Sequence, residues 1–305
     1  MRKYEKLIYA YLLDGEKAVL EALEKVYERA LDDINERIKV LQADELLANR
    51  VYRKQQQEAL KGQVEVILER LHTQEYETIE EYLKESYTDG FIATMYSLHQ
   101  QGLPLTLPIA QEQVVKALVT NSAISEGLYM ALGVDTKHLR KVIASEISRG
   151  IVTNASYGEM ARNVSNQTGI ALKRARTIVI TEAHRIREES SQDARVEAKG
   201  KGANIVKQWD ATLDHRTRDT HRRLDGQIRE IDEPFEIDGK TAMYPGGFGL
   251  AEEDCNCRCV ALTRAKWGLD ERELQTLKER SEFFGLDKKD SFDEFKRKYL
   301  DATQK

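Results

Sequence analysis

The sequence contains few of the residues that interrupt helices. Only four of its 305 residues are proline, and none of these lies within residues 1–103. Because proline removes a backbone N–H and clashes with the preceding turn, its absence leaves this region free to form long helices. No run of about 18 apolar residues occurs, so the sequence also predicts no membrane span.

Cysteine is equally scarce, and its distribution matters more than its number. The three cysteines, Cys255, Cys257 and Cys259, all lie within one five-residue segment. The segment from Met1 to Lys6 lacks the apolar stretch of a signal peptide, so we expect the chain to stay in the cytoplasm where it is made unless another machine carries it. Three clustered thiols in such a protein indicate metal binding more than disulfides.

The chain is highly charged without being a polycation. Charged residues make up 32% and apolar residues 41%, with a formal net charge of −5, which is typical of a folded protein rather than a disordered one. The charge is uneven, because residues 160–223 carry 14 Lys and Arg against 8 Asp and Glu. A basic middle on an acidic chain indicates a local anionic partner and not general coating of DNA.

Residues 1–103 are predicted to form an N-terminal helical region. Apolar residues recur there at steps of three and four, which places them on one helix face that packs against another helix. This pattern favours a helical bundle, and a coiled-coil or partner-docking arm is the alternative. The first stripe consists of Leu20, Leu23, Tyr27, Leu31, Ile34, Ile38 and Leu41, and the second of Leu60, Val64, Ile67, Leu68 and Leu71.

Residues 109–202 are predicted to form a helical middle, which a linker with two prolines separates from the first region. Thr136 is expected to cap a helix that runs to about Arg149. A capping-box motif starts another helix, which is expected to end near Gly169. A longer helix then continues to Lys199 and stops at the glycines that follow.

Residues 203–265 are predicted to form a small α+β domain. A strand is expected at residues 203–209, because apolar and β-branched residues dominate this segment. A short polar helix is expected from about Asp214 to Leu224. The segment that follows is rich in Gly, Asp and aromatic residues, which predicts short strands and loops.

Residues 266–305 are predicted to form a charged helical tail. Ser291 has the spacing of a capping box and is expected to start the last helix of this tail. The fold class predicted for the chain is therefore mainly α, with long N-terminal helices and a helical middle. The small α+β domain adds short strands and a Cys/His cluster.

One ordered set of residues is more diagnostic of a protein family than any other part of the sequence. The set consists of Trp209, Asp214, Arg216, Thr217, His221, Leu224, Asp225, Gly226, Asn256, Cys257, Arg258 and Cys259, in that order. This pattern resembles the phage head morphogenesis family, which is typified by Mu protein F and includes minor head proteins of tailed phages. A helix that contains Thr181 and Glu182 fits the same family, so the resemblance covers roughly residues 110–265.

The resemblance implies a structural component of the virion interior, made in the host cytoplasm during assembly. Members of the family join the procapsid in few copies, contact the portal protein, and are linked to DNA packaging or ejection. The portal protein is therefore the implied partner, and the scaffold and the major capsid protein are further candidates.

The resemblance also implies a zinc site. In the zinc-like version of the family, a Cys-x-x-Cys pair faces the Cys-x-Cys pair, and the corresponding positions here are Arg218 and His221. Arg218 cannot bind zinc, so His221, Cys255, Cys257 and Cys259 are the candidates for the four ligands that zinc requires, an arrangement that demands a curled loop. The residues favour the other interpretation, a metal-free domain in which His221 forms a hydrogen bond and the cysteines pack in the core or stay free.

Several other residues of the pattern are expected to be structural. Thr212 or Asp214 can cap the helix that carries His221, and Asp225 lies four residues after His221, where it can orient the imidazole. Arg258 lies between two cysteines and is expected to be a paired internal arginine. The rest of this structural set consists of Trp209, Arg216, Thr217 and Gly226.

Glu182 is the one acidic residue on an apolar helix stripe. Its carboxylate needs a partner if it is buried, and Arg185 or Arg216 is expected to supply one. We therefore expect a structural ion pair rather than a catalytic carboxylate.

A basic patch is predicted in the middle of the chain, where it can neutralise DNA phosphates. The alternative is a solvated helix face on which acids such as Glu188, Glu189 and Asp193 alternate with the bases. The sequence contains no helix-turn-helix, zinc finger or row of stacking aromatics, so any DNA contact is expected to be weak and independent of base sequence. The patch consists of Lys173, Arg174, Arg176, Arg185, Arg187, Lys199, Lys201, Arg218, Arg222 and Arg223.

No common enzyme motif occurs in the sequence. It has no Walker loop, dinucleotide-binding glycine pattern, Gly-x-Ser-x-Gly or His-Glu-x-x-His. The sequence therefore favours a non-enzymatic assembly protein. One alternative is a metal-dependent nuclease that uses His221 with Asp219 or Asp225. Another is a DNA-binding module without capsid partners.

Overall fold

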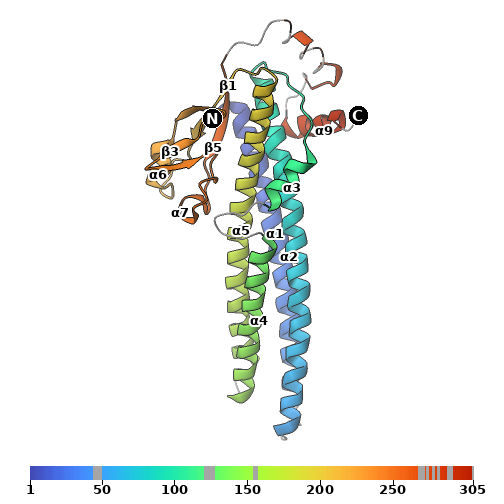
Figure 1. Cartoon of the computed structure of the whole chain (residues 1–305). Helices are drawn as coiled ribbons and strands as arrows, with labels where there is room; N and C mark the ends of the chain where they lie inside the picture. The colour runs from blue at the N-terminus through green and yellow to red at the C-terminus, as the bar shows by residue number, and fades with distance from the viewer. Residues whose placement is uncertain are drawn as a thin grey trace. The chain divides into compact units, whose positions relative to one another are not determined.

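The computed structural model confirms that the chain is mainly helical (Figure 1). It describes residues 1–43, 50–119, 128–153, 157–266, 272, 275–276, 279, 282–286 and 291–303. Three of its helices exceed 40 residues, as the scarcity of proline predicts. The first five helices are α1 (Lys3–Ala43), α2 (Arg50–Gln100), α3 (Gln111–Val119), α4 (Leu128–Val152) and α5 (Tyr157–Gly200).

Contacts divide the chain into two compact units. The first, here called the helical unit, consists of Lys17–Glu81 and Ser125–Val179. The second, here called the mixed unit, consists of Met1–Glu16, Tyr82–Ile124 and Ile180–Lys305. Among the described helices, none is both long and apolar enough to cross a membrane.

The core of the helical unit is formed by the apolar stripes that the sequence shows. Leu23, Ile34 and Ile38 of α1 are almost completely buried, as are Leu68 and Leu71 of α2. A buried hydrogen bond also joins the two helices, because the Tyr27 hydroxyl donates to Glu75 over 2.7 Å. The predicted helical bundle is thus built from side chains spaced three and four residues apart.

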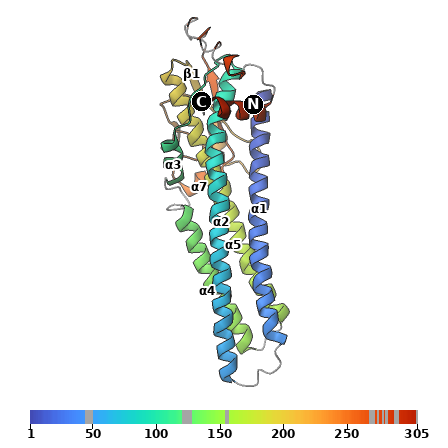
Figure 2. The ribbon, with the colours of Figure 1, turned by 90° about the vertical axis from the view of Figure 1, so that its right-hand side faces the viewer.

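In the mixed unit, α2 and α5 approach so closely that glycine is required at the contact. A Cβ atom on Gly90 would lie 2.4 Å from the backbone oxygen of Arg187. Ser191 Oγ donates to the Gly90 carbonyl over 3.0 Å. The last helix, α9 (Phe292–Thr303), packs against the start of α1, where Phe292 meets Tyr11 edge to face (Figure 2).

The segment of residues 203–265, here called the small domain, contains two antiparallel sheets. The larger has the strand order β2-β1-β5, with Trp209 of β1 paired to Ala261 of β5. The smaller is the hairpin β3-β4. The strands and short helices are β1 (Ile205–Asp210), α6 (Asp219–Leu224), β2 (Ile228–Glu230), β3 (Phe235–Ile237), β4 (Lys240–Ala242), α7 (Ala251–Asp254) and β5 (Val260–Ala265).

The outer edge of β5 is hydrogen-bonded to side chains of α5 and to Gln101, the residue that follows α2. Glu188 accepts from the Ala261 N–H over 3.0 Å, and Arg195 donates to the carbonyl of the same residue. Gln101 donates to the Thr263 carbonyl over 3.0 Å. An edge strand exposes unpaired backbone groups, so these buried polar side chains replace a neighbouring strand.

Three predicted helix boundaries are wrong. Helix α4 begins at Leu128 and runs through Thr136, and α5 is continuous through Gly169. A glycine costs a helix only about 1 kcal/mol, and the buried stripe that includes Val164 and Ala175 on either side outweighs this cost. Helix α6 begins at Asp219 rather than near Asp214, because the Asp214 side chain accepts from the backbone N–H of Arg216 and forms a turn.

Candidate metal centre

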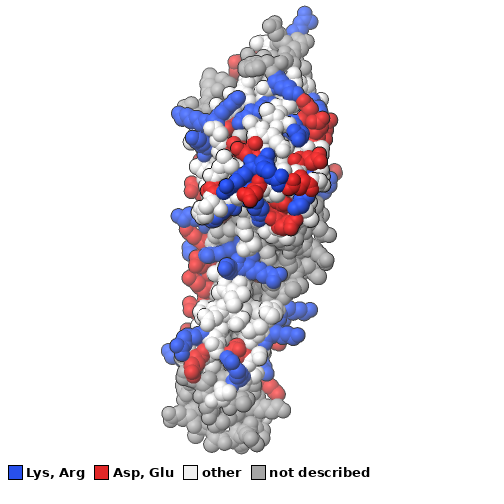
Figure 3. Space-filling model, turned by 90° about the vertical axis from the view of Figure 1, so that its left-hand side faces the viewer, with Lys and Arg blue, Asp and Glu red and all other residues white. Residues whose placement is uncertain are grey.

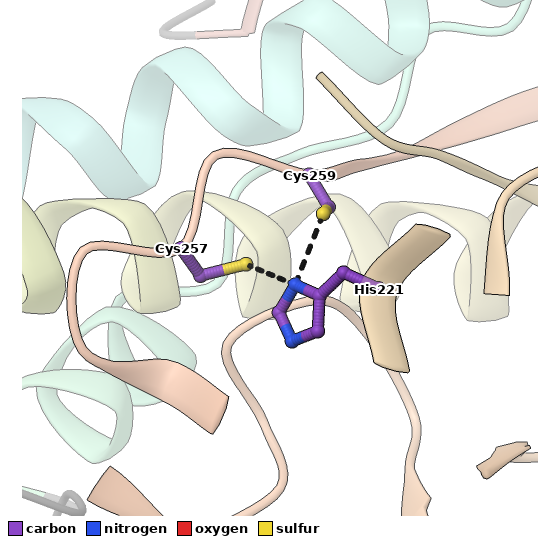
Figure 4. Close-up of side chains that lie close together, drawn as sticks. All are labelled: His221, Cys257 and Cys259. Atoms are coloured by element: carbon purple, nitrogen blue, oxygen red, sulfur yellow. Dashed lines mark hydrogen bonds between the residues drawn. The ribbon is translucent and has the colours of Figure 1, made fainter. Parts of the chain in front are cut away.

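Three side chains from two segments of the small domain meet in its core. His221 lies on α6, whereas Cys257 and Cys259 lie on the loop between α7 and β5. The His221 Nδ1 atom is 3.2 Å from the Cys259 sulfur and 3.7 Å from the Cys257 sulfur (Figure 4). All three side chains are buried, and His221 is only 2% exposed. The predicted contact between the His221 helix and the Cys-x-Cys segment is therefore present.

The loop that carries the cysteines is shaped by the residues beside them. Asp254 accepts from the N–H groups of Phe248 and Leu250, over 3.2 and 3.1 Å, which closes the loop before α7. Asn256 has a φ of 54°, in the left-handed region that asparagine tolerates better than most residues. Its N–H donates to Thr181 Oγ1 of α5 over 3.0 Å. Asn256 thus provides the turn that points both cysteines inward.

Glu253 lies behind His221, on the side away from the sulfurs. Its Oε2 is 3.3 Å from His221 Nε2. Thr220 and Lys240 donate to its two oxygens over 2.9 and 2.7 Å. Burial raises the pKa of Glu253, but these hydrogen bonds outweigh burial and hold its pKa below the usual value. His221 Nε2 makes no hydrogen bond despite this short distance, so the carboxylate acts on the ring through its charge and its packing, while Nδ1 faces the sulfurs.

The two thiols have opposite electrostatic environments. A hydrogen bond to Cys259, together with burial, raises the pKa of Cys257 well above its usual value. The hydrogen bond from Cys257 lowers the pKa of Cys259, and the neighbouring His221 and Trp209 lower it further. Cys259 therefore has thiolate character, which is the form that binds metals.

Trp209 packs against the centre and is fully buried. Its indole meets the His221 ring edge to face at 5.7 Å and the Phe235 ring at 5.1 Å. Phe248 contacts both Trp209 and His221. These rings exclude water from the centre and fix the imidazole in place.

Three donors of the kinds that zinc prefers lie together, which is one fewer than the four ligands of a closed zinc site. In a tetrahedral site with Zn–N of about 2.0 Å and Zn–S of about 2.3 Å, a nitrogen and a sulfur ligand lie about 3.5 Å apart. The two N–S distances in this centre, 3.2 and 3.7 Å, lie on either side of that value. Among the described residues, the group of potential ligands consists of His221, Cys257 and Cys259.

Cys255 does not belong to the metal centre, which corrects the candidate set of four ligands. Its thiol is not part of the three-residue group, and the side chain is only half-buried. Burial raises the pKa of this thiol. The short helix α7 ends just before Cys255, and the chain then turns at Asn256, between Cys255 and the two buried cysteines. Arg218, at the family's first cysteine position, donates to the Cys255 carbonyl over 2.6 Å.

Asp214 and Arg258 form a bidentate ion pair beside the centre, with both N–O distances 2.7 Å. This pair holds the pKa of Asp214 far below its usual value. Thr217 donates to the Thr212 carbonyl within the same turn. Arg216 is exposed, and its backbone N–H donates to the Asp214 side chain. It is therefore not the partner of Glu182.

Asp225 does not orient His221, which corrects the expectation drawn from their spacing. Its carboxylate accepts from the Ala211 N–H over 2.8 Å, at the end of β1. Gly226 follows with a φ of 79° and donates to the Trp209 carbonyl over 2.9 Å. The Leu-Asp-Gly segment therefore joins α6 to β1, and the carboxylate that contacts the imidazole is that of Glu253.

The partner of Glu182 is Arg185. Their side chains are both buried, with Arg185 Nε 3.0 Å from Glu182 Oε2. Arg185 also pairs with Glu189 over 2.7 Å and donates to the Ala117 carbonyl of α3 over 2.9 Å. Arg185 must therefore be removed from the predicted DNA-binding patch, because its guanidinium is inside the protein.

The other predicted DNA-binding residues are divided between the two units. Lys173, Arg174 and Arg176 belong to the helical unit, and the rest belong to the mixed unit. Acidic side chains alternate with basic ones over the small domain (Figure 3). Lys173, Arg174, Lys201 and Arg222 are exposed. Four others are ion-paired, as Arg176–Glu24, Arg187–Glu16, Lys199–Asp232 and Arg223–Asp238.

The residues of the nuclease alternative are not assembled around an accessible centre. His221 is buried against two sulfurs and Glu253, while Asp225 is bonded to backbone and Asp219 is exposed at the start of α6. The sequence analysis missed two features of this region, the position of Glu253 beside His221 and the ion pair between Asp214 and Arg258. Both depend on contacts between distant segments. The run of acidic residues before Cys255 is the one sequence signal for a carboxylate near the centre.

Comparison with known proteins gives a consistent result. The model of the family "Phage Mu protein F like protein" matches residues 141–262. Minor head protein GP7 of Bacillus phage SPP1 is 31% identical over 209 residues, which cover 67% of each chain. NAD(+)--arginine ADP-ribosyltransferase EFV of Enterococcus faecalis is 31% identical over 265 residues, which cover 86% of this chain and 54% of that relative. This chain thus spans about half of the transferase's length, and no solved structure matches.

Proposed function

Because the chain belongs to the phage Mu protein F-like family of minor head proteins, we propose that it binds the portal protein inside the procapsid and acts in head assembly, DNA packaging or DNA ejection. The observation that carries this proposal is the similarity to a named minor head protein over two thirds of both chains. The scaffold and the major capsid protein are further partners in this proposal. The interior of the virion is then its final location.

The role of the Cys/His centre in this proposal is structural. Zinc held by His221, Cys257 and Cys259 would connect α6 to the loop before β5. Without a metal, the same contact depends on hydrogen bonds that involve thiols, which are weak donors and acceptors. The aromatic side chains around the centre keep water away from it and hold His221 in one orientation. The domain is therefore proposed to be a rigid module for docking.

Co-purification with the portal protein tests the proposed function. The full chain and a tagged portal protein from the same phage are co-expressed, captured through the tag, and treated with nuclease to remove DNA bridges. We expect the chain to be retained in a ratio well below one copy per portal subunit. A chain that stays in the unbound fraction at low salt contradicts the portal assignment.

Weak DNA contact is a separate part of the proposal. Lys173, Arg174, Lys201 and Arg222 are exposed, so their side chains can reach phosphates. Binding to a fluorescent 30-base-pair duplex should weaken steeply with salt and not depend on its sequence. The double variants K173A/R174A and K201A/R222A should reduce binding, whereas Arg223→Ala, which removes an ion-paired side chain, should not. Binding that is insensitive to salt and to both double variants would remove DNA from the proposal.

We propose that the chain acts without enzymatic turnover. The transferase relative is much longer than this chain, so its activity cannot be assigned to the shared part from similarity alone. The protein should release no nicotinamide from NAD+ above background in the presence of arginine-rich acceptor protein. It should also leave plasmid DNA intact with Mg²⁺, Mn²⁺ or Zn²⁺. Cleavage that disappears in His221→Ala would favour the nuclease alternative.

A further inference from the structure

Helices α4 and α5 of the helical unit form an antiparallel pair that carries mostly positive charge. Helix α4 ends at Val152 and α5 begins at Tyr157, and so short a connection makes the two helices neighbours that run in opposite directions. A hydrogen bond over 3.0 Å joins Asn163 of α5 to Glu146 of α4. Among the side chains that the structure describes on this pair up to Val179, the exposed charged ones are Lys137, Lys141, Arg149, Arg162, Lys173 and Arg174, with Glu159 as the single acid.

These basic side chains lie on the sides of the two helices that face away from the core of the helical unit. Four of them each come two positions before a buried residue, which places them about 200° around the helix from it. The pairs are Lys137–Leu139, Lys141–Ile143, Arg162–Val164 and Lys173–Ala175. Because the helices are neighbours, their outward sides together form one surface, here called the α4–α5 face. It consists of the six basic residues with Ser145, Asn166 and Ile170 among them.

Other basic residues of α4 and α5 hold the pair to the rest of the helical unit. The half-buried Arg140 pairs with Glu69 of α2 over 3.1 Å, and the half-buried Arg176 pairs with Glu24 of α1 over 2.8 Å. By contrast, the four outward residues that precede buried ones form no salt bridge within the described part of the chain. Their charges are therefore available to an anionic partner.

Negative charge dominates the exposed surface of α1 and α2 in the same unit. Between Lys17 and Glu81, the described and exposed side chains include ten acidic and six basic residues. The acidic residues are Glu21, Glu28, Asp32, Asp33, Glu36, Glu58, Glu65, Glu69, Glu77 and Glu81. The helical unit is thus basic on α4 and α5 and acidic on α1 and α2, so an anion is attracted to the α4–α5 face and repelled by the other two helices.

The composition of the α4–α5 face favours phosphate groups over a protein surface. Ile170 is the one exposed large apolar side chain among its described residues. The core of a protein–protein interface is apolar and aromatic, and lysine is depleted there. Contacts to phosphates come instead from Lys and Arg together with Ser and Asn, which are the residue types of this face. Binding to phosphates is driven by the release of counterions, so it needs no apolar core.

We propose that the α4–α5 face binds the phosphate backbone of double-stranded DNA. The inference rests on the weak DNA contact of the proposed function and assigns that contact to one surface. It adds Lys137, Lys141 and Arg162, which lie outside the basic patch predicted from the sequence, and joins them to Lys173 and Arg174. The acidic surface of α1 and α2 is repelled by DNA, so the helical unit lies on the duplex with its α4–α5 face toward the phosphates.

Two matched triple variants of the full chain test the inference. K137A/K141A/R162A removes three basic residues of the face, and K25A/R37A/K39A removes three exposed basic residues of α1 and changes the net charge equally. Binding to the fluorescent 30-base-pair duplex is measured by anisotropy over a series of salt concentrations. The face variant should bind at least about tenfold more weakly at low salt, with a log–log salt slope that falls by about 2–3, since each phosphate contact contributes about 0.9. The control should keep its slope and weaken less than about threefold.

Two further measurements exclude other causes of a weaker affinity. Far-ultraviolet circular dichroism should show the same helix content in both variants, because alanine is well tolerated at exposed helix positions. Sedimentation of the full chain without DNA at low salt tests a competing partner, the acidic surface of α1 and α2 on a second copy. We expect no self-association that depends on the α4–α5 face. Self-association that K137A/K141A/R162A abolishes would assign the face to a second copy and overturn the inference.

The results for DNA separate this inference from the proposed function. Equal loss of binding in the face variant and the control would overturn the inference. DNA binding that falls only in K201A/R222A would also overturn it, but would leave the DNA contact intact and place it on the mixed unit. A native chain that does not bind the duplex would contradict both the DNA contact and the α4–α5 face. Capture by the portal protein is measured after nuclease treatment, so it stands or falls independently of these results.

Discussion

The core of the helical unit is spread over long stripes of apolar side chains, whereas the core of the small domain converges on Trp209 and three potential metal ligands. In the helical unit, residues such as Leu23 and Ile34 are buried one after another along a helix. In the small domain, His221 is joined to Cys257 and Cys259 from a segment more than 30 residues away. The difference predicts that single substitutions in the helical unit each lower its stability by a moderate amount. The stability of the small domain, in contrast, should depend strongly on a few side-chain atoms.

The largest expected effect is the loss of the small domain when the proposed zinc is removed. A strong zinc chelator, or the double variant C257S/C259S, should lower stability by more than about 5 kcal/mol, since bound zinc supplies about 10–16 kcal/mol to zinc-finger peptides. The measurement is the near-ultraviolet circular dichroism during thermal unfolding, to which the buried Trp209 contributes. Cys255→Ser is the matched control and should retain the wild-type response to chelator. An unchanged unfolding curve after chelation would show that the contact holds without metal.

The next effect belongs to the helical unit and should be insensitive to the chelator. Ile34 is 1% exposed, so Ile34→Ala should cost about 2–5 kcal/mol through lost burial and an unfilled cavity. Val66 lies on α2 and is 57% exposed, so Val66→Ala should change stability by less than about 0.5 kcal/mol. Denaturant unfolding followed by far-ultraviolet circular dichroism measures both. Equal losses in the two variants would contradict the stripe as the source of stability.

Glu253 offers a sharper test within the small domain. Glu253→Gln removes the charge behind His221 and should weaken zinc binding by about 10–100-fold, as other outer carboxylates do. Glu252→Gln is the control, because Glu252 shares Lys240 with Glu253 over 2.6 Å but makes no contact with His221. Competition with a chromophoric zinc chelator gives both affinities. Identical affinities would mean that Glu253 only anchors Lys240.

The smallest expected effect is a dependence of stability on pH at the edge of β5. Burial raises the pKa of Glu188 to about 7 despite the nearby Arg195. The folded chain therefore binds more protons than the unfolded chain between about pH 4.5 and 7, so this group's contribution to stability falls as pH rises through that window. We expect stability to fall by at most about 1.4 kcal/mol per pH unit within this window. Thermal unfolding of Glu188→Gln should show a flatter profile, and an unchanged slope would assign the dependence to another group.

The sequence predicted those features that depend on local pattern. Apolar spacing was sufficient to predict the long helices, and the strand β1 followed from its run of β-branched and aromatic residues. The pairing of His221 with Cys257 and Cys259 could be inferred because the ordered motif resembles a known family. All three predictions use information that lies along the chain.

The features that the sequence did not predict depend on contacts between distant segments. Glu252, Glu253 and Asp254 are three consecutive acids, and only the tertiary structure shows that Glu253 faces His221. Cys255 lies in the same five-residue segment as the other two cysteines, yet the turn at Asn256 separates it from them. Arg185 was placed on a solvated face because periodicity does not reveal that α3 covers it.

The most direct test of the account is the metal content and first coordination shell of the full chain, purified without chelators. Elemental analysis with zinc-edge X-ray absorption should give one zinc per chain, with two sulfur ligands near 2.3 Å and one imidazole nitrogen near 2.0 Å. The zinc should be lost in Cys257→Ser and retained in Cys255→Ser. A chain that is fully folded without zinc, or whose zinc has three sulfur ligands, would contradict the claim that His221, Cys257 and Cys259 form the zinc site.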